Sequence, residues 1–104
     1  MDRNKEFEVV ISERAAEMLV THVRFLAEVS PQSSDDLRKK IIDSSKSLQH
    51  FPERNPYLSD PLLPANKYRK MTINKRYLLI YQVVDRTVYV DYIVDCRQDY
   101  RWLL

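Results

Sequence analysis

Residues 68–81, YRKMTINKRYLLIY, place four cations around the most hydrophobic stretch of the chain. Arg69 and Lys70 lie in the first apolar run, and Lys75 and Arg76 lie beside the turn that separates it from the second. Arginine and lysine bind phosphate oxygens through charge-assisted hydrogen bonds, and each such contact makes nucleic-acid binding salt-dependent. Two interpretations are therefore open, a phosphate-binding cluster and an ordinary solvated hairpin.

Other reactive side chains are few and isolated. His22 falls on the apolar side of a helical pattern, His50 precedes a proline-rich stretch, and neither has a second ligand at the spacing of a zinc site. Cys96 is the only cysteine and has no histidine close to it in the sequence. The chain contains no glycine, which excludes the glycine-rich loops of the common nucleotide-binding sites. We therefore interpret both histidines as structural and expect neither a cofactor nor a metal ion.

Length and composition predict one globular domain over residues 1–104. Apolar residues make up 44% of the chain and charged residues 31%, which argues against disorder. The 17 Lys and Arg barely exceed the 15 Asp and Glu, so the net charge of +2 does not by itself indicate a nucleic-acid-binding protein. A single cysteine excludes an intrachain disulfide, no apolar stretch approaches the roughly 18 residues that span a bilayer, and the N-terminus lacks a signal-peptide pattern. We expect a cytoplasmic protein without a membrane partner.

Two amphipathic helices are expected in the first half of the chain, after a short strand over residues 7–11. Ser12 has the side chain of a helix N-cap, and apolar residues then recur at helical spacing. Ser30-Pro31 ends this helix, and a second helix begins two or three residues later. The apolar stripe of the second helix consists of Leu37, Ile41, Ser45 and Leu48. The short break between them predicts an antiparallel helical hairpin.

Three strands are expected in the second half, after a proline-rich loop over residues 51–66. They span residues 68–73, 77–84 and 87–95. The dipeptides Asn74-Lys75 and Asp85-Arg86 lie between them at the spacing of two-residue hairpin turns. We therefore expect an antiparallel meander, with the N-terminal strand joining one edge and the helical hairpin covering one face.

Side-chain alternation divides the strands between two faces. The face expected under the helices carries Tyr68, Lys70, Thr72, Tyr77, Leu79, Tyr81, Val83, Val88, Val90, Tyr92 and Val94. The opposite face has Met71, Leu78 and Ile80 at its middle and charged residues at its rim. Because exposed apolar patches usually bind a partner, we expect this face to be open and to bind one.

The chain carries five motifs in the order SERAAEML, SLQHFPERNP, YRKM, KRYLLIY and DCRQDYRWLL. Together they resemble the RelE/ParE family of toxins from bacterial toxin–antitoxin pairs, over essentially the whole chain from Phe7 onward. The resemblance implies an α+β fold in the order β-α-α-β-β-β, with a two-helix hairpin packed on one face of a small curved antiparallel β-sheet. It also implies a growth-inhibiting toxin of a type II, plasmid-stabilisation system. A cognate antitoxin neutralises such a toxin by wrapping a partly disordered segment around it.

The family has two known activities, and their sites differ. RelE-like members cut messenger RNA in the ribosomal decoding site, whereas ParE-like members inhibit DNA gyrase and do not cut RNA. In the cutting branch a 2′-hydroxyl attacks the adjacent phosphate, which requires a base, an acid and cations that stabilise the developing charge. When the site residues of the cutting branch are matched to this sequence, Arg69 corresponds to a basic residue of the second strand. Arg97 and Tyr100 correspond to the pair of site residues at the end of the fourth strand. Met71 and Leu78 stand where cutting members have basic residues.

These differences favour a toxin that acts by binding a target such as DNA gyrase. The alternative is a ribosome-dependent, metal-independent mRNA endonuclease with a degenerate active site formed by Arg69, Arg76, Arg97 and Tyr100. A third hypothesis is an interaction module without toxicity. The expected partners are a cognate antitoxin and either gyrase or the ribosome with its mRNA. The open face further predicts a homodimer or a toxin–antitoxin hetero-oligomer.

Overall fold

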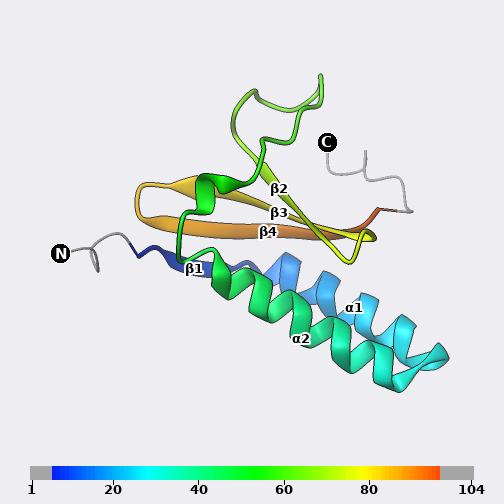
Figure 1. Ribbon diagram of the computed structural model, residues 1–104. Helices are drawn as coiled ribbons and strands as arrows, with labels where there is room; N and C mark the ends of the chain where they lie inside the picture. The colour runs from blue at the N-terminus through cyan, green and yellow to red at the C-terminus, as the bar shows by residue number, and fades with distance from the viewer. Residues whose placement is uncertain (1–5, 97–104) are drawn as a thin grey trace.

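The computed structural model describes residues 6–96, which form a four-stranded β-sheet with two helices along one side (Figure 1). The elements follow in the order β1 (Glu8–Ile11), α1 (Glu13–Val29), α2 (Pro31–Ser47), the short 3-10 helix η2 (Pro52–Arg54), β2 (Arg69–Ile73), β3 (Tyr77–Val84) and β4 (Thr87–Asp95). The predicted α+β fold and the β-α-α-β-β-β order are confirmed. Residues 1–5 and 97–104, and with them Arg97 and Tyr100, lie outside the described residues.

The sheet is mixed rather than wholly antiparallel. Its strand order is β1-β4-β3-β2, with antiparallel β2–β3 and β3–β4 pairs and a parallel β1–β4 pair. The parallel pair arises because two consecutive helices return the chain to the end of the sheet where β1 begins. The backbone N–H of Phe7 donates to the carbonyl of Gln49 at 2.9 Å and marks this return. The chain then enters β2 in the direction of β1, and two reversals later β4 runs the same way.

Serine side chains cap both helices. The hydroxyl oxygen of Ser12 accepts a hydrogen bond from the N–H of Ala15 at 3.0 Å, which confirms the predicted start of α1. Ser30 ends α1, and its hydroxyl oxygen accepts from the N–H of Ser33 at 3.2 Å in the first turn of α2. α2 therefore begins at Pro31, earlier than predicted, because a proline in the first turn lacks only an N–H that has no partner within a helix.

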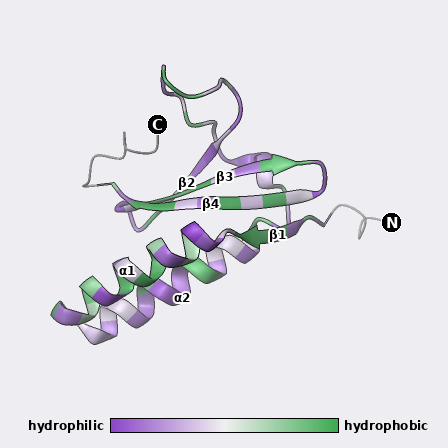
Figure 2. Cartoon of the chain, turned by 180° about the vertical axis from the view of Figure 1, so that it is seen from behind, coloured by the Kyte–Doolittle hydropathy of each residue, from purple (hydrophilic) through white to green (hydrophobic). Residues whose placement is uncertain are grey.

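The main hydrophobic core lies between the helices and the sheet, where Figure 2 shows apolar colour on both layers. Its buried residues are Ala15, Leu37, Ile41, Leu48, Ile73, Tyr77, Leu79, Tyr81, Val88, Val90 and Ile93. The predicted stripe of α2 is buried, including Ser45, whose hydroxyl donates to the carbonyl of Ile41 at 2.9 Å. Each large aliphatic side chain removed from water contributes roughly 1.5–3 kcal/mol, so this layer dominates the stability of the fold.

The predicted face assignment of β2 is wrong, because the β2–β3 turn contains three residues rather than two. Ile73 pairs with Tyr77, so residues 74–76 form the turn, and the first two of them have positive φ angles of 55° and 59°. A shift of one residue moves every side chain of a strand to the other face. Met71 therefore lies opposite Leu79 and packs against the main core, on the side of the helices.

A bulge in β4 reverses the predicted faces of its second half. Ile80 pairs with Tyr92, but the next residue of β3 pairs with Val90, so Asp91 is an extra residue on β4. Tyr92 consequently lies on the outer face, away from the helices, while Ile93 joins the main core.

The outer face of the sheet is partly covered by the chain itself. Leu58 and Leu63, from the loop between η2 and β2, belong to a second apolar cluster with Leu78 and Ile80 of β3. The N–H of Leu58 donates to the carbonyl of Tyr68 at 2.7 Å and holds the loop against β2. Figure 1 shows this loop on the side of the sheet opposite the helices. The predicted open, apolar centre of this face is therefore wrong, since Leu78 is only 8% exposed.

Candidate functional site

Arg69, the first residue of β2, holds the segment that follows η2. One nitrogen of its guanidinium donates to the carbonyl of Glu53 at 3.0 Å and to that of Asn55 at 2.7 Å. The guanidinium carbon also lies 3.9 Å from the centre of the Tyr57 ring, within the range of a cation–π contact. The side chain predicted to bind phosphate is therefore engaged by the protein's own backbone and by an aromatic ring.

Tyr81, opposite Arg69 in the β2–β3 pair, is a buried structural phenol. Its hydroxyl donates to the carbonyl of Pro52 and accepts from the side-chain amide of Asn55 at 3.1 Å. Burial raises the pKa of Tyr81, and the Asn55 hydrogen bond and the nearby Arg69 charge oppose this rise only in part. The phenol therefore stays protonated and fixes η2 to the sheet, and it is a poor general base.

Arg76 lies in the turn between β2 and β3, at the end of the hairpin opposite Arg69, and its contacts hold this turn against the end of β4. Its Nε lies 3.4 Å from a carboxylate oxygen of Asp95, whose side chain is buried, and its guanidinium carbon is 5.1 Å from the centre of the Tyr77 ring. The backbone carbonyl of Arg76 accepts a hydrogen bond from the N–H of Cys96. These contacts join the turn to the end of β4.

Arg69 and Arg76 lie at opposite ends of β2 and are not brought together. Four steps of about 3.3 Å separate the Cα atoms of Arg69 and Ile73 by about 13 Å, and the turn follows beyond Ile73. The other two cations of this stretch are divided as well, since Lys70 lies opposite Ile80 on the outer face and Lys75 is in the turn. Within residues 6–96, the predicted cations form no common phosphate site.

The two histidines have different surroundings. The Nε2 of His22 donates to the carbonyl of Ile93 at 2.8 Å, and its ring centre lies 5.4 Å from that of Tyr77, in agreement with a structural role. His50 lies 4.0 Å from a carboxylate oxygen of Glu6, and both side chains are more than half exposed. No group of three potential metal ligands occurs among the described residues, and no helix among them is long and apolar enough to cross a membrane.

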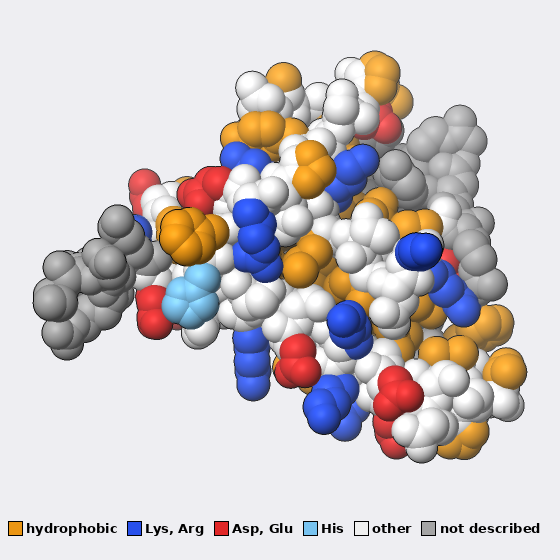
Figure 3. Space-filling view, in the orientation of Figure 1, with side chains coloured by type: hydrophobic (Ala, Val, Ile, Leu, Met, Phe, Trp, Pro, Cys, Tyr) orange, Lys and Arg blue, Asp and Glu red, His pale blue; other side chains and the backbone are white. Residues whose placement is uncertain are grey.

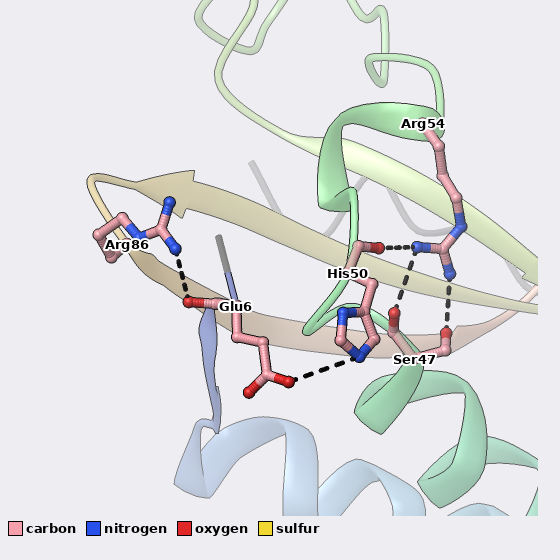
Figure 4. A network of polar contacts seen from close by, with 5 residues as sticks. All are labelled: Glu6, Ser47, His50, Arg54 and Arg86. Atoms are coloured by element: carbon pink, nitrogen blue, oxygen red, sulfur yellow. Dashed lines mark hydrogen bonds and ion pairs between the residues drawn. The ribbon is translucent and has the colours of Figure 1, made fainter. Parts of the chain in front are cut away.

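Sequence reasoning missed a polar network at the C-terminal end of α2 (Figure 4). The Arg54 guanidinium donates to the backbone carbonyls of Ser47, His50 and Phe51 and to the hydroxyl of Ser47, at 2.7–3.3 Å. It thereby joins Ser47, the last residue of α2, to the turn that leads into η2. Arg86 similarly donates to the carbonyl of Glu6 at 2.9 Å. Nothing in the spacing of these arginines indicates such partners, because the acceptors are backbone atoms brought close by folding.

Two hollows beside the loop that precedes β2 do not resemble a catalytic cleft. A small apolar cavity of about 30 Å³ lies on the outer face between the loop and the sheet, lined by Leu58, Leu63, Tyr68, Ile80 and Tyr92. A wider hollow of about 290 Å³ lies within the loop over residues 57–66, and its only charged lining residue is Asp60. Figure 3 shows Lys and Arg on the visible face with Asp and Glu among them, so positive and negative side chains are mixed on this face.

Comparison with known proteins identifies both a family and a fold. The family model described as the ParE toxin of type II toxin-antitoxin system, parDE, matches residues 9–100. None of the curated proteins compared with the chain matches it significantly. Among solved structures, a chain of the chromosomal ParDE TA system from P. aeruginosa has a TM-score of 0.73 at 13% sequence identity, covering 88% of this chain and 97% of that chain. At this identity the similarity concerns the fold alone.

Proposed function

Because the chain belongs to the ParE toxin family of type II toxin–antitoxin systems, we propose that it inhibits growth in the cytoplasm by binding a macromolecular target such as DNA gyrase, without cutting RNA. The observation that supports this mode of action is that the side chains of Arg69 and Arg76 contact other residues of the same chain. Both are engaged in internal contacts, and they lie at opposite ends of β2. RNA cleavage requires a base, an acid and cations around one phosphate, whereas a binding toxin requires only a complementary surface.

The position of Leu78 supports the same proposal. It stands where the cutting branch of the family carries an arginine, and here it belongs to the apolar cluster that Leu58 covers. Its side chain therefore faces the loop of the same chain instead of a ligand. Arg97 and Tyr100 remain the two candidate catalytic residues outside the described part of the chain.

We further propose that a cognate antitoxin binds and neutralises this protein. A partner is favoured by apolar side chains near the free edge of β1, a strand of only four residues. Val10 of β1 lies opposite Tyr89 of β4, and the two side chains are 37% and 38% exposed. Co-expression with the product of the neighbouring gene and isolation of a stable complex would test this, with light scattering to separate a complex from a homodimer of the toxin.

Supercoiling of relaxed plasmid by purified gyrase tests the proposed target. We expect the purified chain to inhibit supercoiling in proportion to its concentration. Arg97→Ala and Tyr100→Phe serve as variants for the endonuclease hypothesis, each examined for supercoiling and for mRNA cleavage on ribosomes. Full gyrase activity at toxin excess, together with mRNA cleavage that either variant abolishes, would replace the proposal with the endonuclease.

A further inference from the structure

The stripe of α1 that faces the sheet continues past the end of the sheet. Met18 packs against both apolar clusters, and the ring of His22 donates to the carbonyl of Ile93, so the first part of the stripe is covered. Phe25 and Val29 follow His22 by three and seven residues, on the same side of the helix. Figure 1 shows both helices extending beyond the sheet at this end. Phe25 is 60% exposed and Val29 is 77% exposed, so residues 6–96 leave the second part of the stripe largely uncovered.

The spacing of the stripe is that of a helix-packing seam. Its members Met18, His22, Phe25 and Val29 are separated by four, three and four residues, as are the a and d positions of a coiled coil. A second helix packs on such a seam with apolar side chains of its own at the same spacing. The uncovered half of the seam is therefore suited to a helix from another molecule.

Two exposed charges beside the seam are poorly satisfied within one copy. Glu28 lies in the last turn of α1, where the negative end of the helix dipole disfavours a carboxylate, and no basic residue shares that turn. Arg24 precedes Glu28 by four residues, an order that pairs less well along a helix than the reverse. Within residues 6–96 neither side chain forms an ion pair. A partner that brings a cation to Glu28 and an anion to Arg24 is therefore favoured.

We propose that a second copy of this chain packs on the seam, with the two α1 helices antiparallel about a two-fold axis near Leu26. An axis midway between Arg24 and Glu28 places each of them level with the other residue of the partner, so the ion pair forms twice. With a rise of about 1.5 Å per residue, the two Phe25 side chains are offset by only about 3 Å along the helices. Val29 is offset from the partner's Phe25 by about the same distance. Because the helices extend beyond the sheet, the two sheets lie at opposite ends of this dimer.

The expected dimer is weak. Two large apolar side chains and two charges per copy are far fewer than the roughly 20–30 residues a side of a standard interface. We therefore expect a dissociation constant above about 10 µM. This dimer goes beyond the proposed target binding and does not depend on it, and its test does not use gyrase.

Sedimentation equilibrium of the full-length protein over a wide range of concentrations measures the dimer. The double variant Phe25→Ser/Val29→Ser removes the apolar half of the contact and should weaken dimerisation by about tenfold or more. Val20→Ser is the matched control, because Val20 is 47% exposed on a different side of α1, and it should leave the affinity unchanged. Far-UV circular dichroism verifies that each variant is folded, which the exposure of the replaced side chains favours.

The charges give a sharper test. Arg24→Glu and Glu28→Arg each place like charges opposite one another in a homodimer, so each variant alone should remain monomeric at concentrations where the wild type dimerises. An equimolar mixture of the two variants should form a heterodimer, since both acidic positions of one copy then face both basic positions of the other. Mixing would not rescue a variant whose helix is merely damaged.

Three results would overturn the proposal. The first is a wild type that remains monomeric at the highest concentration reached. The second is a dimer that the Phe25→Ser/Val29→Ser variant leaves intact or that Val20→Ser weakens equally, because another surface would then hold it. The third is a mixture of the two charge variants that remains monomeric, because the antiparallel pairing of Arg24 with Glu28 would then be wrong.

Discussion

Replacing His22 with alanine would remove the hydrogen bond to the carbonyl of Ile93 at an edge of the sheet. β1 ends at Ile11, so within residues 6–96 the second half of β4 has no neighbouring strand on that side. Side chains of α1 and its cap take the place of a strand there. The hydroxyl of Ser12 donates to the carbonyl of Asp91 at 3.3 Å, and the Nε2 of His22 donates to that of Ile93 at 2.8 Å.

The expected loss follows from the burial of this contact. Ile93 is fully buried, and a buried carbonyl left without a partner costs about 1–3 kcal/mol. Loss of the ring contact between His22 and Tyr77 adds about 0.5–1.5 kcal/mol. We therefore expect His22→Ala to lower the free energy of unfolding by about 1.5–4.5 kcal/mol, which corresponds to a decrease in Tm of roughly 6–36 °C for a domain of this size.

Urea denaturation followed by circular dichroism measures this loss, with an unchanged m-value as the sign that only stability has changed. His22→Gln retains a donor and should recover more than half of the loss. His50→Ala is the matched histidine control, because its exposed pair with Glu6 should contribute less than about 1 kcal/mol. A loss for His22→Ala no larger than that for His50→Ala, or an equal loss for His22→Gln and His22→Ala, would refute the stabilising role of the hydrogen bond to Ile93.

Three further predictions follow from local contacts. Arg54→Ala removes four hydrogen bonds at the end of α2, and we expect a loss of about 1–2 kcal/mol in unfolding free energy and faster amide exchange in the last turn of α2. Unchanged exchange in that turn would contradict the capping role. Phe51 has a left-handed φ of 51°, so Phe51→Gly should raise the unfolding free energy by up to about 1 kcal/mol in the urea assay, and Phe51→Ala should not. Equal effects of the two would refute strain as the cause. Burial and the Asp95 charge raise the pKa of the Cys96 thiol above its ordinary value of 9.0. At pH values below 9.0, iodoacetamide should therefore alkylate Cys96 more slowly than it alkylates a free cysteine peptide, because less of Cys96 is thiolate. The difference in rate should shrink as the pH rises above 9.0. Equal rates would contradict this shift.

The sequence predicts those parts of the fold that depend on local chemistry. Ser12 caps α1 because its hydroxyl needs only the N–H of a residue three positions later, and the stripe of α2 is buried because its spacing matches the helical period. The faces of the sheet depend instead on counts of single residues. The turn after Ile73 contains a third residue, and β4 contains the extra residue Asp91. Each of these single residues moves the side chains of a strand segment to the opposite face of the sheet, and no glycine marks either position.

The candidate site was less predictable, because the partners of its cations are distant in the sequence. Arg69 and Arg76 can be identified as cations, but their engagement depends on the backbone of Asn55 and the carboxylate of Asp95, which folding brings near. The cover over Leu78 was missed for the same reason. A proline-rich segment is typical of a connecting loop, and the burial of its leucines requires the sheet beneath it.

Induced expression in growing cells, with newly formed RNA ends mapped on ribosomes and plasmid supercoiling measured in the same samples, tests the central claim most directly. A toxin that acts by binding gyrase predicts growth arrest with loss of negative supercoiling and no new RNA ends. Codon-restricted RNA ends at normal supercoiling, abolished by Arg97→Ala, would contradict the account.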